Sequence, residues 1–328
     1  MVVQHPEMSL FSTKLLYSDN ELNPFRRPHS VMITYTPSCN GTKQDPRSFP
    51  RSDRSDSKTL VVSLTPATED LEILEVNMHG TKTKAYLMPA EISSWFSGWF
   101  GYDVKLAYIG ENSRGVLGSL DPGLNKSSHE KVLVSPIGLS AKISNSKEPV
   151  KISFADCAEY LVVTEQSLQD ASSRLPDGED MDITKFRPNI VVSDDKIQAW
   201  DEDFWATISV TSHGQNRSPQ CDKKRIEIEF TANCVRCASL NVDYATGAMG
   251  KGASGQILRR LKADRIVDRG ATFSPVFGRY GFLKEGLGDV IRVGSEVSIE
   301  GFNKERDAFG KSAAEFHSSA RKSYCGVT

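Results

Sequence analysis

Residues 231–247 read TANCVRCASLNVDYATG and hold the two cysteines that lie closest together in the chain, Cys234 and Cys237. An alternating apolar and polar segment, residues 225–230, leads into them, and a turn sequence that ends in Gly247 follows. The pair is therefore predicted to lie where a β-strand runs into a turn. This position is the starting point for both the fold and the chemistry expected of the chain.

Three interpretations of the cysteine pair compete. With Arg236 between the cysteines, a thiolate would lie beside a fixed cation and would suit a transition metal or sulfur chemistry. A structural zinc site needs a second pair or histidines at metal spacing, and a redox dithiol of this spacing normally lies between a strand and a helix. The third interpretation is two ordinary cysteines near a strand end. The other cysteines are scattered singly, at Cys39, Cys157, Cys221 and Cys325.

Composition sets the class of protein. The chain has 328 residues and a formal net charge of −2, so electrostatics gives no reason to expect nucleic acid or an anionic membrane as a partner. No window approaches the roughly 18 apolar residues of a membrane-spanning helix, and the first residues resemble no targeting peptide. Six irregularly spaced cysteines do not suggest a disulfide framework. We expect an intracellular protein, in the cytoplasm, with mitochondria as the alternative if the native chain is longer.

The first part of the chain is predicted to be rich in strands. Residues 43–58 are charged and rich in Ser and Pro, which indicates a mobile surface loop. Strand patterns cover 59–64, 71–76, 82–87 and 104–109. A helix is predicted over 91–101, because its apolar residues recur at helical spacing and form one stripe typical of a core. These residues are Ile92, Trp95, Phe96, Trp99 and Phe100.

A weakly patterned stretch rich in Gly, Ser and Pro, residues 114–149, separates this part from a second one. In the second part, helices are predicted over 165–175 and 257–262. Strands are predicted over 160–164, 186–192, 206–211, 225–230, 277–282 and 290–299. Because strands outnumber helices, the expected fold is mainly β (α+β), an antiparallel barrel with a few packed helices.

Five segments of the second part resemble, in the same order, the MOSC family, named after the C-terminal domain of molybdenum cofactor sulfurase. They are residues 154–156, 164–168, 186–191, 234–247 and 277–280, and residues 293–297 resemble the family's terminal strand. In the first part, residues 5–10, 76–80 and 91–101 are similar to the family's N-terminal β-barrel domain. The chain is identified as a member of this family.

The resemblance implies a domain organisation. It comprises an N-terminal β-barrel-like domain at 1–112, a variable linker at 113–150, a catalytic MOSC barrel at 151–303 and a tail at 304–328. The family's opening strand, of the type Tyr-Pro-Val/Ile-Lys-Ser, has no counterpart here, so the first domain is expected to be truncated at its start. Val3 stands where the family has an arginine, and Cys157 and Ala158 stand at its hydroxyl-bearing positions.

The resemblance also implies a molybdenum–pyranopterin cofactor whose metal is bound by the thiolate of Cys237. Cys234 would then either support the site from behind the metal ligand or be structural. Arg187 and Asn189 would bind the cofactor, since a guanidinium suits a phosphate and a carboxamide suits the pterin edge. Arg236 would place positive charge beside the thiolate and Tyr280 would line the site. Asp156 is similar to a carboxylate that lines the catalytic site.

The implied activity is reduction of N-hydroxylated small molecules. Electrons would come from a small b-type cytochrome and its flavin reductase. Two alternatives stay open. The first is a non-enzymatic protein that carries the molybdenum cofactor or passes sulfur to it. The second is a degenerate MOSC protein without cofactor, which the missing N-terminal strand would favour because several cationic contacts to an anionic cofactor are lost with it.

Overall fold

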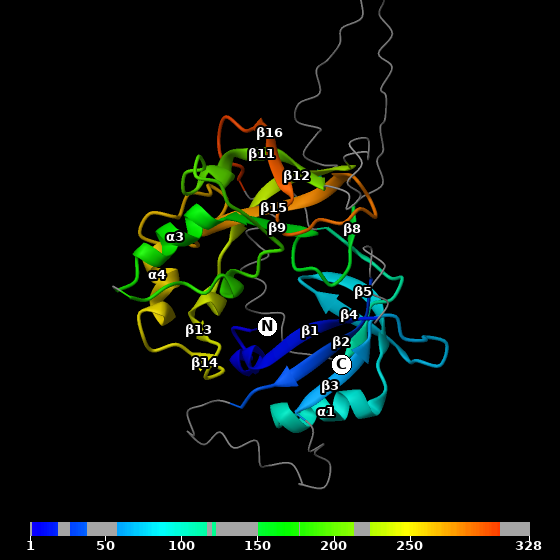
Figure 1. Ribbon diagram of the computed structural model, residues 1–328. Helices are drawn as coiled ribbons and strands as arrows, with labels where there is room; N and C mark the ends of the chain where they lie inside the picture. Colours follow the sequence, from blue (N-terminus) through cyan, green and yellow to red (C-terminus); the bar gives the residue numbers. More distant parts are fainter. Residues whose placement is uncertain are drawn as a thin grey trace, which may run out of the picture.

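The computed structural model describes residues 2–18, 27–37, 58–116, 120–122, 150–176, 178–212 and 224–308 (Figure 1). Below, residues 2–116 are called the N-terminal region and residues 150–308 the C-terminal region. The surface loop expected at 43–58 lies outside the described residues except for Lys58. Among the described residues, no helix is long and apolar enough to cross a bilayer.

The N-terminal region contains two antiparallel sheets of three strands each. The first consists of β1 (Phe11–Tyr17), β2 (Pro28–Tyr35) and β3 (Thr59–Ser63). The second consists of β4 (Ile73–Met78), β5 (Thr81–Leu87) and β6 (Ala107–Tyr108). The three predicted strands that became β3, β4 and β5 are confirmed within two residues, whereas the one expected at 104–109 is only the short β6.

Helix α1 (Ala90–Phe100) packs against the first sheet, as its apolar stripe predicted. Trp95 is buried and its ring centroid lies 5.9 Å from that of Phe11 on β1. Phe11 also stacks on Phe100, at 4.8 Å between centroids. Gly101 ends the helix in the left-handed conformation, at φ 78°, and its N–H donates to the carbonyl of Ser97. The aromatic stripe is therefore core, not a ligand site.

The C-terminal region is built on one curled sheet of six strands, in the order β10–β9–β15–β12–β11–β16 (Figure 1). Its strands are β9 (Tyr160–Thr164), β10 (Ile190–Val192), β11 (Trp205–Ser212), β12 (Lys224–Val235), β15 (Val276–Glu285) and β16 (Glu296–Phe302). The mainly β fold is confirmed. One pair departs from the antiparallel expectation, because β10 runs parallel to β9. Helix α3 (Glu165–Ser173) lies in the connection that such a parallel pair requires.

Both faces of this sheet are buried. On β9, Leu161 and Val163 point into one apolar cluster with Phe186 and Phe277, whereas Val162 points into a second cluster around Trp205. Strands buried on both faces read as continuous apolar runs, and β9 has the sequence YLVVT. A short helix, α4 (Ile257–Leu261), contributes Ile257 and Leu261 to the first cluster.

Buried charges are paired beneath the sheet. Asp203 is fully buried, and its carboxylate accepts hydrogen bonds from Arg265 Nη2 at 2.9 and 2.8 Å and from Arg306 Nε at 2.8 Å. Arg279 is also fully buried and donates to Asn233 Oδ1 at 2.7 Å and to the carboxylate of Asp307. The segment after β16 is thereby held to the sheet.

The two regions meet at several places. The short strands β7 (Arg114–Gly115) and β8 (Lys151–Ile152) pair across the expected linker, of which residues 123–149 lie outside the described chain. In addition, the 3₁₀ turn η1 (Pro6–Leu10) lies against the turn that contains Gly247. A Cβ on Gly247 would lie 2.7 Å from Leu10 Cγ, so the close approach requires glycine.

Candidate functional site

The cysteine pair lies at the end of β12, as predicted from the sequence. Cys234 is buried in the strand, whereas Cys237 is exposed and precedes the 3₁₀ turn η7 (Ala238–Asn241). The Cys237 thiol lies 3.2 Å from Ser239 Oγ. Arg236, between the cysteines, donates its backbone N–H to the carbonyl of Pro275. The two thiols therefore have different environments, and only that of Cys237 is accessible from solvent.

The Arg236 side chain has a different main neighbour from the one expected. It is buried and donates from Nη1 to Cys234 Sγ at 2.8 Å and from Nη2 to the carbonyl of Phe186 at 2.6 Å. Burial opposes its charge, but the neighbouring Cys234, Tyr280 and Cys237 outweigh that effect and raise the pKa of Arg236. Its charge thus acts chiefly on Cys234 and only secondarily on Cys237.

Arg187 and Asn189 follow the short turn η5 (Ile183–Phe186). Arg187 adopts the left-handed conformation, at φ 56°, and its exposed guanidinium has no hydrogen bond or ion pair within the described chain. Asn189 is tied to β9, because its Oδ1 accepts from the N–H of Leu161 at 2.8 Å and its own N–H donates to the carbonyl of Leu161. Arg187 is thus open to an anionic ligand, whereas Asn189 keeps only its amide nitrogen for one.

Asp156 pairs with a residue of the N-terminal region. Its Oδ1 lies 2.5 Å from Nε2 of His79, in the turn between β4 and β5. Partial burial opposes ionisation of Asp156, but the hydrogen bond and charge of His79, followed by the charges of Arg187 and Arg236, lower its pKa overall. Asp156, Arg187 and Arg236 were all predicted as site residues, and they lie near enough to interact electrostatically.

Tyr280 is almost fully buried beneath this group rather than open to solvent. Burial, then the neighbouring Cys157, Cys234 and Asp156, raise the pKa of Tyr280 well above its ordinary value. Burial also raises the pKa of the Cys157 thiol, with Asp156 and Cys234 adding to the effect and the Tyr280 hydroxyl opposing it. Tyr280, Cys157 and Cys234 therefore form a buried layer beneath the exposed residues.

Sequence reasoning missed three residues of this group: His79, Lys185 and Tyr244. Lys185, which precedes the Phe-Arg-Pro-Asn segment, is buried, with Nζ 5.9 Å from the centroid of the Tyr244 ring. Burial raises the pKa of Tyr244, and Arg187 and Arg236 oppose this. Lys185 could have been predicted from the sequence, because it directly precedes a segment that carries a cation. His79 could also have been noticed, since a histidine before a glycine in a hairpin turn is uncommon.

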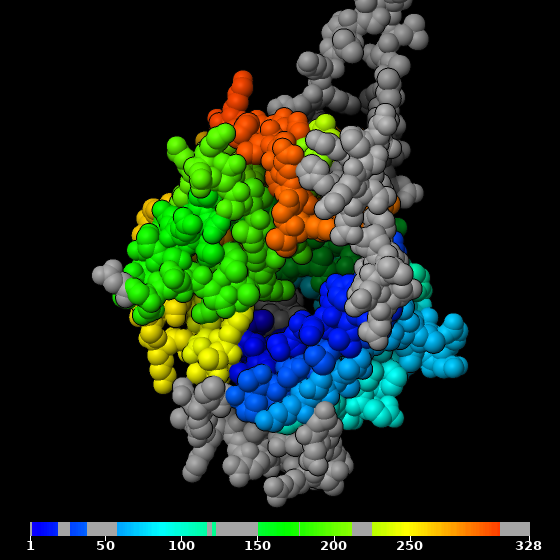
Figure 2. All heavy atoms as spheres, in the orientation of Figure 1, coloured from blue at the N-terminus to red at the C-terminus, as the bar shows by residue number. Residues whose placement is uncertain are grey.

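The donor set fits a metal carried by an anionic cofactor. Cys237 offers one exposed sulfur, and the neighbouring Arg236 interacts with it electrostatically. Lys185 and Arg187, both from the η5 segment, lie near Tyr244, on which Arg236 also acts. Among the described residues, no three His, Cys, Asp or Glu side chains form a metal-binding group, so a metal at Cys237 would take its remaining ligands from elsewhere. The surface is hollowed along the junction between the blue N-terminal strands and the C-terminal region (Figure 2).

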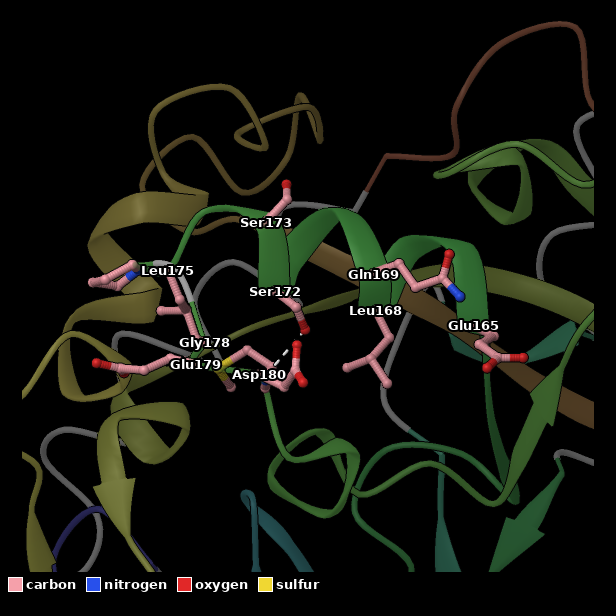
Figure 3. A pocket seen from close by; sticks show the side chains of 11 residues that line it. Glu165, Leu168, Gln169, Ser172, Ser173, Leu175, Gly178, Glu179 and Asp180 are labelled. Atoms are coloured by element: carbon pink, nitrogen blue, oxygen red, sulfur yellow. Dashed lines mark hydrogen bonds between the residues drawn. The ribbon is translucent and has the colours of Figure 1, made fainter.

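A separate hollow of about 660 Å³ runs along α3 (Figure 3). Side chains of α3, among them Glu165, Leu168 and Ser172, line it together with the loop that contains Glu179 and Asp180. None of the predicted site residues borders it. The hollow is therefore not the site assembled around Cys237.

Residues 149–298 match the family model of the MOSC domain, in agreement with the resemblance. Among curated proteins, the chain is similar to mitochondrial amidoxime-reducing component 1 of Danio rerio, 30% identical over 158 residues, which cover 47% of this chain and 42% of the relative. The human protein of that name is 32% identical over 155 residues, 46% of this chain and 40% of the relative. Mitochondrial amidoxime reducing component 2 of Macaca fascicularis is 30% identical over 151 residues, 45% and 38% respectively. The match thus spans less than half the length of these relatives.

Proposed function

We propose that this chain, which carries a MOSC domain, binds a molybdenum–pyranopterin cofactor through Cys237 and reduces N-hydroxylated small molecules. The observation that supports the proposal is the exposed Cys237 thiol next to the buried Arg236, in a candidate site where the guanidinium of Arg187 has no ion-pair partner in the described chain. The name of these relatives, amidoxime-reducing component, indicates the substrate class that we propose.

The cofactor, when bound, would supply the two-electron chemistry that removes an oxygen atom from the substrate. Overall, the N–O bond is broken, two electrons and two protons are consumed, and an amine or amidine and water are formed. A small b-type cytochrome with its flavin reductase is the electron source that we propose.

The residues of the chain would bind and orient. Cys237 provides the metal ligand, and Arg187 offers a guanidinium to an anionic group of the cofactor. The amide nitrogen of Asn189 is the part of that side chain left for the pterin. Arg236 holds the end of β12 against the carbonyl of Phe186, which positions Cys237 and Arg187 relative to each other. Asp156, ionised at neutral pH, can accept a hydrogen bond from the N–OH or amidine N–H of a substrate.

Molybdenum content of the purified protein, measured by elemental mass spectrometry, tests the proposal. Near-stoichiometric molybdenum is expected in the wild type and none in Cys237→Ser. Cys234→Ser is the matched control, because a serine hydroxyl can still accept from Arg236, and we expect it to retain metal. Equal molybdenum in wild type and Cys237→Ser would contradict the assigned ligand.

Turnover is then measured with benzamidoxime and a reconstituted electron-donor chain. Reduction by the metal-loaded wild type supports the oxidoreductase. Bound molybdenum without turnover on N-hydroxylated compounds would favour a carrier of the cofactor. Absence of molybdenum after expression in a host that makes the cofactor would favour the degenerate protein.

A further inference from the structure

We propose, resting on the function proposed above, that His79 is a positioning residue for Asp156. The β4–β5 hairpin of the N-terminal region would thereby complete the site of the C-terminal region. The contact joins residues far apart in the chain, at 2.5 Å between His79 Nε2 and Asp156 Oδ1. Only 14% of the His79 side chain is exposed, against 46% of Asp156, so the imidazole lies behind the carboxylate and not in front of it.

The backbone places His79 at some energetic cost. His79 and Gly80 form a two-residue hairpin turn, with φ of 57° and 83°, which are the values of a type I′ turn. The first position of such a turn favours asparagine, aspartate or glycine, because a left-handed backbone costs other residues about 1 kcal/mol or more. The hairpin is otherwise well held, since Asn77 Oδ1 accepts from the N–H of Gly80 at 3.0 Å. A histidine here is better explained by what its side chain contacts than by the turn.

A second contact ties the same hairpin to the loop that carries Asp156. Arg114 is buried and donates from Nη1 to Thr81 Oγ1 at 3.0 Å, on the hairpin. The same guanidinium donates to the carbonyls of Ser153 at 3.1 Å and Asp156 at 2.6 Å. Arg114 therefore fixes the main chain of the loop, and the direction of the Asp156 carboxylate is left to His79.

The charges around Asp156 explain why its carboxylate has to be held in one orientation. The guanidinium of Arg187 is exposed, without a hydrogen-bond partner in the described chain, and acts electrostatically on Asp156. Released from His79, the carboxylate would be drawn into an ion pair with Arg187, which would remove the carboxylate from the substrate and the guanidinium from the cofactor. With Oδ1 held by His79, Asp156 Oδ2 has no hydrogen bond within the described chain and can receive one from a substrate.

Four proteins test this role: wild type, His79→Gly, Asp156→Asn and the double variant. Glycine accepts the left-handed backbone, so His79→Gly removes the side chain without straining the turn. We expect His79→Gly to lower kcat for benzamidoxime, per bound molybdenum, by about tenfold or more. The double variant should be no slower than Asp156→Asn alone, because His79 acts through Asp156. Losses that multiply in the double variant would overturn the proposal.

Two further variants separate positioning from other roles. His79→Gln keeps an N–H donor of similar reach, and we expect it to restore kcat to within about threefold of wild type. A His79→Gln variant as slow as His79→Gly would overturn simple positioning. His29→Gln, which changes an exposed histidine of β2, is the matched control and should leave kcat unchanged. A purely structural role would lower molybdenum content and stability but not kcat per bound metal.

Unfolding of the cofactor-free proteins gives a readout that does not depend on activity. In urea, the shift in midpoint caused by His79→Gly should be smaller in the Asp156→Asn background than in the wild type. Equal shifts in the two backgrounds would overturn the inference, whatever the catalytic result. If the wild type binds no molybdenum and turns over no substrate, the proposed function fails, and the urea cycle alone decides whether His79 holds Asp156.

Discussion

Replacement of Arg265 by methionine should destabilise the C-terminal region strongly, because it would leave the charge of Asp203 buried. Asp203 is fully buried and its carboxylate receives two contacts from Arg265, at 2.8 and 2.9 Å. Removal of one partner of a buried ion pair costs about 3–5 kcal/mol. Arg265 also lies 3.9 Å from the centroid of the Trp200 ring, a contact that contributes about 1 kcal/mol more. Arg306 retains one bond to Asp203, so the expected net loss is about 4 kcal/mol.

The measurement is equilibrium unfolding of the cofactor-free protein in urea, followed by tryptophan fluorescence. Arg306→Met is the matched control, because Arg306 is one-third exposed and donates to the same carboxylate. It should lose only about 1 kcal/mol. In an Asp203→Leu background the cost of Arg265→Met should largely disappear, since no charge is then left unpaired. If Arg265→Met costs no more than Arg306→Met, the buried pair does not hold this region together.

The perturbation should also reach the site. Trp200, under Arg265, packs edge-on against Phe277 at 5.5 Å between ring centroids, and Phe277 stacks on Phe186 at 3.9 Å. The carbonyl of Phe186 accepts from Arg236. We therefore expect Arg265→Met to retain less molybdenum than Arg306→Met at a temperature at which both remain folded.

Burial raises the pKa of Glu202 to about 7; the charge of Asp203 adds to this effect, and hydrogen bonds from the hydroxyls of Ser167 and Thr164 oppose it. The protonated carboxyl therefore contributes stability that is fully present below the pKa of Glu202 in the unfolded chain. This contribution is lost as the pH rises through about 7. Between pH 5 and pH 8, the stability of Glu202→Gln in urea unfolding should therefore rise by about 2.5 kcal/mol relative to that of the wild type. An equal difference between the two proteins at both pH values would contradict this. In thermal unfolding, Gly278→Ala should lower stability by about 2 kcal/mol or more, because at φ 85° its Cβ would lie 2.7 Å from Val163 Cγ1. Gly288→Ala is the control: its φ is 88° but no atom lies within 4 Å of its Cβ, so it measures the backbone contribution alone. Gly247→Ala should loosen η1 from the turn it contacts, seen as faster amide hydrogen exchange of residues 6–10 with exchange in β15 unchanged.

Periodicity and buried runs predicted most of the elements. The strand at 160–164 and the helix over 91–101 follow from local patterns that tertiary packing reinforces, so they lie within a residue of the prediction. The parallel alignment of β10 was not predictable from its three residues, because strand direction depends on the connection and not on side-chain alternation. The strand predicted at 104–109 was too long, because only Ala107 and Tyr108 of that segment pair with a neighbouring strand.

For the site, motif residues were easier to predict than their partners. Cys237 and Arg187 were identified from the segments that contain them, and both side chains are exposed. The direction of the Arg236 side chain could not be predicted from the sequence, because its contact with Phe186 depends on how two distant segments pack. His79 lay in a different region from every motif that pointed to catalysis, and only the packed structure shows it against Asp156.

The position of β9 in the sheet has a consequence for how the protein is made. Val162 on β9 pairs with Arg279 on β15, so the strand next to Asp156 is completed only when distant residues have been synthesised. Sheets with such long-range pairing fold slowly and expose apolar strands in the meantime. The apolar run of β9 would thus lack its β15 partner until that strand has been synthesised. A ligand that needs the assembled site could bind only after β15 has paired with β9.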